Sequence, residues 1–252
     1  MKIIISPAKS LDFESPHPEV NATAPKFLNQ AARVNAELRQ KSPQELGSLM
    51  GISAPLADLN YQRNQNWAVV HHKANSRPAI FAFTGEVYRG FSVGTLDQKF
   101  FGLMQDSLRI LSGQYGLLRP FDRLQPYRLE MGTKISIDGE KNLYSFWTDA
   151  ITEELRSQLS KNELLLNLAS NEYAKTVRLK ELGHQVVTPV FKELKNGQYK
   201  VVSVYAKHAR GLMARYIIEK NVNDLEGVKG FTLANYRHNE SLSSEAELIF
   251  TR

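Results

Sequence analysis

The sequence predicts a single compact α/β domain in which a mixed sheet is surrounded by helices. Short apolar runs typical of buried strands alternate along the chain with segments whose apolar residues recur at helical spacing. No repeat, low-complexity tract or Gly/Ser-rich linker interrupts the 252 residues, so the predicted domain covers residues 1–252. With 42% hydrophobic residues, a chain of this length can bury a large core.

The first two predicted elements are a strand and a helix. Lys2–Ile5 is a short apolar run that ends at a Ser-Pro pair, as a buried strand does where it delivers a loop to a site. Lys9 lies on that loop. In Pro25–Lys41 the apolar residues recur at helical spacing, with Arg and Lys toward the outside and the later turns. This segment should be an amphipathic helix.

The next segment predicts two short helices joined by a tight turn. Ser42 can cap the first helix, because Pro43 takes its first position and Glu45 its third, which completes a capping box. Gly51-Ile52-Ser53 then forms the turn, and Ala54–Tyr61 supplies the second helix.

Residues 42–64 resemble a helix-hairpin-helix module, in which a Gly-Ile-Gly turn directs backbone amides toward DNA phosphates whatever the base sequence. Ser53 replaces the second glycine here, and its hydroxyl and amide can still contact a phosphate. Leu56 and Leu59 should face back toward the first helix. Structural helical hairpins share this pattern, so a purely structural role stays open.

Two further elements precede a polar loop. Pro78–Phe83 is apolar enough for a central strand, and Gly85 breaks the run that follows it. Asp97–Leu111 has the pattern of a helix.

The loop Ser112–Gly132 is too polar and too rich in Gly and Pro for ordinary core, yet too rich in Tyr, Leu and Phe for a solvated linker. Its glycines permit left-handed or closely approached backbone and its prolines fix φ, so the loop should be rigid. Arg119, Arg123 and Arg128 lie within it, and rigidly held guanidinium groups suit phosphate or carboxylate oxygens. A structural ion pair between Arg128 and Glu130 is the alternative.

The second half of the chain predicts a helix, a strand and a helix in succession. Ile151–Leu159 has a helical pattern, and Leu164–Ala169 is a continuous apolar run that suits a strand buried on both faces. Asn171–Leu182 should be helical and end at Gly183. Two strands, Gln185–Lys192 and Tyr199–Tyr205, then flank an Asn-Gly pair typical of a type I′ hairpin.

The last predicted helix, Lys207–Lys220, carries several cations near its start and middle. Lys207 and Arg210 are neighbours at i, i+3, and Arg215 follows one turn later. Cations near a helix start oppose the macrodipole unless an anion bridges them, so we expect a phosphate nearby. A solvated basic face is the alternative.

Overall composition limits the classes of function. A net charge of +6 favours polyanionic partners. The absence of cysteine excludes disulfides, thiolate metal sites and a thiol that senses oxidant. No apolar run is long enough for a spanning helix, and Pro7 interrupts the start before a signal peptide can form. We therefore expect a cytoplasmic protein with no membrane partner.

Five blocks, in order along the chain, resemble the YaaA family of peroxide stress response proteins. They are IISPAKSLDF (4–13), FTGEVYRGF (83–91), SGQYGLLRPFDRLQPYRLEMG (112–132), NLASNEYAK (167–175) and SVYAKHARGLMARYIIE (203–219). The resemblance covers essentially the whole chain. It implies a bacterial cytoplasmic protein that limits oxidative damage during peroxide stress. It also implies one unusual α/β fold, DNA binding in a positively charged cleft, and a helix-hairpin-helix element.

These observations predict non-specific contacts between DNA phosphates and one basic cleft, which should join Lys9, Arg128, Lys207, Arg210 and the turn at Gly51. The predicted phosphate-binding residues are Lys9, Gly51, Ser53, Arg119, Arg123, Arg128, Lys175, Lys207, Arg210 and Arg215. The residues predicted to line a ligand pocket are Ser6, Tyr115, Tyr127, Glu130 and Asn171. We expect no cofactor and no metal, because the histidines lack 2-His-1-carboxylate spacing. The protein should act as a monomer.

An enzyme is the rival class. The residue types that would bind and transform a phosphorylated or nucleobase-like ligand are present at Lys9, Tyr115, Arg128, Glu130, Asn171, Glu172 and Tyr173. No phosphate-binding loop, dinucleotide fingerprint, nucleophile elbow or zincin motif accompanies them, so no reaction is assigned. A third hypothesis is an interaction protein whose basic cleft holds RNA or an acidic protein.

Overall fold

A mixed eight-stranded sheet runs through the centre of the computed structural model, which describes all of residues 1–252. The strands lie in the order β11-β12-β9-β8-β1-β5-β6, and β10 pairs with the end of β9. The four pairs from β12 to β5 are parallel and the others are antiparallel. Strands of the main sheet are β1 (Lys2–Ile5), β5 (Leu108–Ser112), β6 (Gly116–Leu118), β8 (Leu165–Leu168), β9 (Val186–Lys195), β10 (Gln198–Lys200), β11 (Arg237–His238) and β12 (Glu247–Thr251). The predicted α/β fold with a mixed sheet is confirmed.

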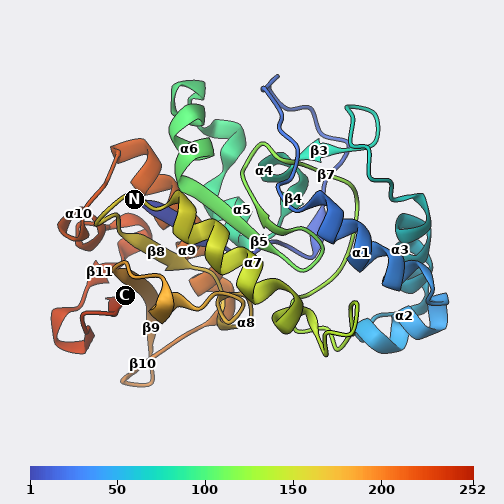
Figure 1. Ribbon diagram of the computed structural model, residues 1–252. Coiled ribbons are helices and arrows are strands. Elements are labelled where there is room, and N and C mark those ends of the chain that lie inside the picture. Colours follow the sequence, from blue (N-terminus) through green and yellow to red (C-terminus); the bar gives the residue numbers. More distant parts are fainter.

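Helices surround this sheet. Figure 1 shows α7 crossing in front of the strands, while α1, α2 and α3 gather at the right of the molecule. The helices are α1 (Leu28–Arg39), α2 (Pro43–Met50), α3 (Ala54–Asn66), α4 (Ala79–Ala82), α5 (Glu86–Phe91), α6 (Phe101–Ser107), α7 (Leu143–Gln158), α8 (Asn171–Ala174), α9 (Ser203–Lys220) and α10 (Leu225–Lys229). Two small sheets pair β2 (Ser10–Leu11) with β4 (Phe83–Thr84), and β3 (Arg77–Pro78) with β7 (Arg123–Leu124). None of the helices is both long enough and apolar enough to span a membrane.

Strand β1 lies in the middle of the sheet, as its isoleucines predict. Ile3, Ile4 and Ile5 have no exposed surface, because β-branched side chains fill both faces of a buried parallel strand. In the register of the sheet, Ile5 lies opposite Leu168 of β8. The loops that follow β1 and β8 therefore leave the same edge of the sheet side by side.

Helices α5 and α9 cross in direct backbone contact through two glycines. A Cβ atom on Gly90 would collide with the carbonyl oxygen of His208, and one on Gly211 would collide with the carbonyl oxygen of Val87. Only glycine allows two helix backbones to approach this closely. The crossing fixes the position of α9 relative to the loop that precedes α5.

The loop after β5 packs closely against the rest of the protein. Gly116 adopts φ 69°, and a Cβ on Gly113 would lie 2.5 Å from the carbonyl oxygen of Leu129. Trp147 is fully buried against Gly116 and donates a 2.9 Å hydrogen bond to the carbonyl oxygen of Gly113. Tyr115 is fully buried in the same region.

Two predicted elements in the first half are wrong in type or length. Pro78–Phe83 is not a central strand, because Ala79–Ala82 forms the helical turn α4 between two-residue strands. The helix predicted over Asp97–Leu111 ends at Ser107, and the chain continues as β5. A short buried apolar run can form either a helix or a strand, and pairing with β1 makes Leu108–Ser112 a strand.

The later elements also differ from prediction at their ends. The helix predicted over Ile151–Leu159 begins at Leu143, because Asn142 and Ser145 form a capping box. The helix predicted over Asn171–Leu182 is confined to α8 and a 3₁₀ turn at Leu179–Glu181. Strand Leu164–Ala169 is confirmed as β8.

The C-terminal hairpin is confirmed in its turn but not in its second strand. Asn196 and Gly197 both have positive φ, as a type I′ turn requires. β10 ends at Lys200, and α9 begins at Ser203. Lys207 therefore lies one turn inside α9, so the prediction that it opposes the macrodipole at a helix start is wrong.

The capping box that starts α2 is confirmed. The Ser42 hydroxyl accepts from the Glu45 amide, and the Glu45 carboxylate accepts from the Ser42 amide at 2.7 Å. Gly51 ends α2 with φ 61°. Leu56 is partly buried, but Leu59 is 45% exposed, so the prediction that Leu59 faces α2 is wrong.

The glycine crossing predicts an unusually costly alanine substitution. Gly211→Ala should lower the free energy of unfolding by about 3 kcal/mol, because the added methyl group meets backbone that cannot move alone. Gly102→Ala in α6 is the control, since its Cβ would meet nothing within 4 Å and alanine favours a helix. Denaturant unfolding of both variants measures the difference, and equal midpoints would contradict the proposed role of the crossing.

Candidate functional site

A cavity of about 270 Å³ lies at the carboxyl ends of β1 and β8, and we call it the strand-end cavity. The loop after β1, the β4–α5 segment, the loop before α7, the start of α8 and one face of α9 surround it. Its lining residues are 6–10, 84–88, 127–130, Ser170, Glu172, Tyr173, Lys207 and Arg210.

The topology of the sheet explains why a cavity forms here. The chain leaves β1 toward β5 on one side, whereas it leaves β8 toward β9 on the other side. Loops that leave adjacent parallel strands in opposite directions open a crevice between them, and ligands of α/β proteins bind in such crevices. At the base of the crevice, the Ser6 hydroxyl accepts a 2.9 Å hydrogen bond from the Ser170 amide.

Two cations of the cavity share one carboxylate. Lys9 Nζ lies 2.6 Å from Glu130 Oε2, and an Arg128 terminal nitrogen lies 3.8 Å from Glu130 Oε1. Arg128 Nε is buried and has no hydrogen-bond partner. The structural ion pair between Arg128 and Glu130 is thus present, but it leaves the Arg128 guanidinium incompletely satisfied.

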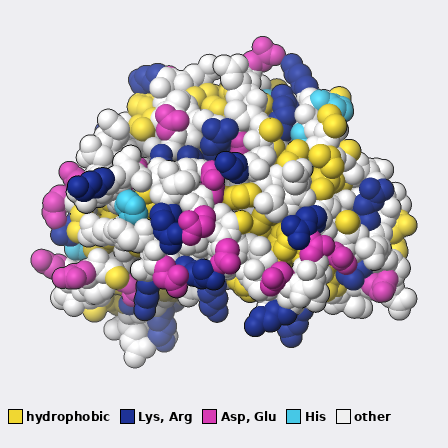
Figure 2. All heavy atoms as spheres, viewed as in Figure 1, with side chains coloured by type: hydrophobic (Ala, Val, Ile, Leu, Met, Phe, Trp, Pro, Cys, Tyr) yellow, Lys and Arg dark blue, Asp and Glu magenta, His cyan; other side chains and the backbone are white.

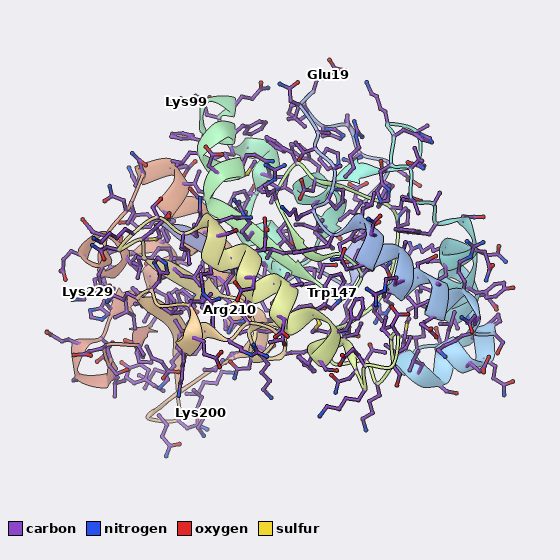
Figure 3. All side chains as sticks on the ribbon, viewed as in Figure 1. Glu19, Lys99, Trp147, Lys200, Arg210 and Lys229 are labelled. Carbon is purple, nitrogen blue, oxygen red and sulfur yellow. The ribbon has the colours of Figure 1, made fainter.

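The two cations contributed by α9 have no partner in the protein. Neither Lys207 nor Arg210 makes a hydrogen bond through its side chain or an ion pair, although both line the cavity. Burial lowers the pKa of Arg210, because desolvation disfavours its charge and no carboxylate compensates. A guanidinium remains charged under these conditions, so the cavity holds a cation that lacks its counter-ion. Figure 3 shows Arg210 in the lower middle of the molecule, near α8.

Three tyrosines form one wall of the cavity. Burial raises the pKa of Tyr88, Tyr127 and Tyr173, so all three are neutral phenols. The Tyr88 hydroxyl donates to the carbonyl oxygen of Ser6 at 3.1 Å. These residues offer aromatic surface, and they are unsuited to act as bases at neutral pH.

Carboxylates also line the cavity, so its charge is mixed. Glu130 pairs with Lys9, and Glu86 lies 2.5 Å from Arg89 and 3.6 Å from His208. Glu172 Oε1 accepts a 3.0 Å hydrogen bond from the Gly132 amide. Figure 2 shows the same mixing on the molecular surface, where Lys and Arg side chains of the lower half alternate with Asp and Glu.

Seven of the residues predicted as site residues meet in the strand-end cavity. They are Ser6, Lys9, Tyr127, Arg128, Glu130, Lys207 and Arg210. Sequence reasoning did not select Thr84, Gly85, Glu86 or Ser170 as site residues, although they line the same cavity. Gly85 has φ 119°, a conformation that requires glycine, so the break that it makes in an apolar run was the available signal.

Several predicted site residues lie outside the cavity and interact with other groups of the protein. The Arg215 guanidinium donates to the carbonyl oxygens of Phe91, Ser92 and Thr95, and it pairs with Glu219. It thereby satisfies the backbone at the end of α5.

Two loop arginines and one tyrosine also lie outside the cavity. Arg119 Nε lies 3.5 Å from Asp122, and Arg123 donates to the carbonyl oxygen of Ser76. The Tyr115 hydroxyl accepts from Trp67 Nε1 at 2.8 Å in the core.

The remaining predicted residues are exposed and do not line the cavity. Gly51 and Ser53 form the turn between α2 and α3, while Asn171 and Lys175 begin and follow α8. No group of three or more His, Asp or Glu side chains is arranged to hold a metal ion.

Comparison with known proteins gives a full-length match. A family model described as "Peroxide stress protein YaaA" matches residues 1–242. A UPF0246 protein of Saccharophagus degradans is 48% identical over 100% of this chain and 99% of its own length. UPF0246 proteins of Idiomarina loihiensis and Flavobacterium psychrophilum are 49% and 47% identical over 100% of this chain, and over 98% and 100% of their own lengths.

The absence of a counter-ion predicts that removing Arg210 stabilises the empty protein. Arg210→Met should raise the free energy of unfolding by about 1 kcal/mol, because it replaces an unpaired and partly desolvated charge with an apolar side chain. Arg215→Met on the same helix should lower it by about 3 kcal/mol, since the carbonyl groups at the end of α5 lose their donor. Calorimetric or denaturant unfolding compares the two, and a destabilised Arg210→Met variant would contradict this account.

Proposed function

The chain belongs to the YaaA family of peroxide stress proteins, and from this premise we propose that it binds DNA without sequence preference and limits oxidative damage, including iron-dependent damage. The supporting observation is the pair of unpaired cations on α9. Lys207 and Arg210 face the strand-end cavity, where Arg128 has a further unsatisfied donor. Backbone phosphates are the anions that would satisfy these groups without reading base sequence.

The turn between α2 and α3 supplies a second contact for the same proposal. The amides of Ser53, Ala54 and Leu56 have no acceptor in the protein, and the Ser53 hydroxyl makes no capping bond. Such free amides at the start of a 13-residue helix favour a phosphate.

Helix α3 connects the two contacts. Burial lowers the pKa of Arg63, near the end of α3, and the positive charge of Arg128 lowers this pKa further. Ser53 and Arg63 are about 15 Å apart along the helix, which is roughly the rise of four or five base pairs. A single short stretch of duplex that follows α3 would therefore reach both the turn and Arg63.

Bound protein would protect DNA by covering it. The chain has no cysteine, so it cannot remove or sense oxidant through a thiol. A protein that coats the phosphate backbone excludes solvent and displaces the cations condensed on the duplex. Iron ions held by the phosphates are among the cations that this binding would displace.

Phosphate contacts by α9 predict a defined salt dependence. In fluorescence anisotropy with a 30-base-pair duplex, Lys207→Gln/Arg210→Gln should reduce the slope of log affinity against log salt by about 1.8, because two counterions fewer are released. Lys161→Gln is the control, since Lys161 is exposed and precedes β8, at the opposite edge of the sheet. Two duplexes of unrelated sequence should bind equally. An unchanged slope in the double variant would remove α9 from the DNA interface.

The turn is tested by a substitution that should favour the fold. Ser53→Asp places a good helix-capping residue before α3, so stability should be kept or rise by up to about 1 kcal/mol. The same carboxylate would repel a phosphate, so DNA affinity should fall at least about tenfold at low salt. Lys161→Gln lowers the net charge by the same amount and separates a local effect from a global one. Wild-type affinity in Ser53→Asp would show that the turn does not contact DNA.

A further inference from the structure

We propose that the strand-end cavity binds one nucleotide unit, with its phosphate between Lys207 and Arg210 and its base against the tyrosine wall. The unit has two chemical sources, a free mononucleotide or a single extrahelical nucleotide of bound DNA. Binding of a free mononucleotide is independent of the function proposed above, whereas capture of an extrahelical nucleotide rests on it.

The size of the cavity excludes a duplex and suits a small ligand. Its volume of about 270 Å³ lies near the lower limit for small-molecule sites, which is about 300 Å³. The position between the diverging loops of β1 and β8 is where α/β proteins hold such ligands. A duplex can contact only the mouth of this cavity, so the groups inside it require another partner.

The cations supply the phosphate-binding half of the site. Arg210 has no partner in the protein and Arg128 Nε is a buried donor without an acceptor, so both lack an oxygen ligand. Lys207 lies one turn from Arg210 on α9 and faces the same cavity. The cavity is lined by four cations and three carboxylates, so the cations outnumber the carboxylates by one. The cations are Lys9, Arg128, Lys207 and Arg210, and the carboxylates are Glu86, Glu130 and Glu172. This balance matches a single phosphate group better than a polyphosphate.

The aromatic and apolar side chains of the cavity suit a base. Tyr88, Tyr127 and Tyr173 provide aromatic surface, beside the apolar side chains of Val87 and Leu129. Aromatic side chains bind bases by stacking, and sites for extruded bases combine such surface with hydrogen bonds to the base edge.

Glu172 supplies an acceptor for the edge of the base. Its Oε1 atom accepts from the Gly132 amide, and its Oε2 atom has no hydrogen-bond partner. Carboxylates accept from the amino and ring N–H groups of bases. Guanine presents two such donors side by side, so guanosine 5′-monophosphate is the mononucleotide probe.

The first experiment titrates the intact protein with this nucleotide by isothermal calorimetry. We expect saturable binding of one molecule per chain, and binding of guanosine or inorganic phosphate at least tenfold weaker. Arg210→Gln should weaken nucleotide binding at least tenfold and Glu172→Gln at least fivefold, whereas Lys161→Gln should change it less than twofold. Since Arg210 has no partner to lose, its variant should keep the wild-type melting temperature or exceed it.

The second experiment places 2-aminopurine as a single unpaired bulge in a 25-base-pair duplex and compares it with the same base fully paired. Stacking on the tyrosine wall should quench the bulged base on binding of the wild-type protein, and Arg210→Gln should abolish that quenching while the duplex is saturated. Guanosine 5′-monophosphate binding without quenching assigns the site to free nucleotides. Quenching without such binding assigns it to extrahelical ones.

Absence of both signals overturns the inference. So does nucleotide binding that Arg210→Gln and Glu172→Gln leave unchanged. Paired-duplex affinity, measured in parallel, separates the two proposals: duplex binding without either signal refutes the cavity ligand alone, and nucleotide binding without duplex affinity refutes the DNA-binding function alone.

Discussion

The contact between Gly90 and Gly211 is the constraint on which the functional part of this molecule depends. Helix α9 can approach α5 only because neither backbone carries a Cβ atom at the crossing. Since α5 begins directly after the cavity-lining residues Thr84 and Gly85, the crossing brings Lys207 and Arg210 to the ends of β1 and β8. Segments nearly the whole chain apart in sequence thus form one site.

Arg210 and Arg215 show how one helix can serve structure and binding at once. Arg215 donates to the end of α5 and to Glu219, so all of its charge is used within the protein. Arg210, little more than one turn earlier, is partly buried and has no partner. Natural proteins rarely bury a charge without compensation, and sites that bind charged ligands are where they do so. The contrast marks the face of α9 that receives an anion.

The sequence predicted closely the two strands whose ends form the cavity, whereas several other elements were wrong in type or length for physical reasons. β1 and β8 are largely apolar runs of strand length, and both were predicted within a residue. The secondary structure of Ala79–Ala82 and Leu108–Ser112 was predicted wrongly. Both are short buried runs, and tertiary pairing decides whether such a run forms a helix or a strand. The cations of the site were selected by residue type. Lys9, Arg128, Lys207 and Arg210 were also expected in one groove, and they meet in the strand-end cavity. The internal partners of Arg123 and Arg215 were not predicted, because they lie far away in sequence.

The central claim is that Arg210 lacks an anion which its ligand provides. The most direct measurement follows the arginine Nε–H resonances of ¹⁵N-labelled protein by NMR while a short DNA duplex carrying one unpaired nucleotide is added. The account predicts large shifts and slowed solvent exchange at Arg210 and Arg128, with Arg215 unchanged as the internal reference. Saturation with DNA that moves the resonances of other arginines and leaves Arg210 unchanged would contradict it.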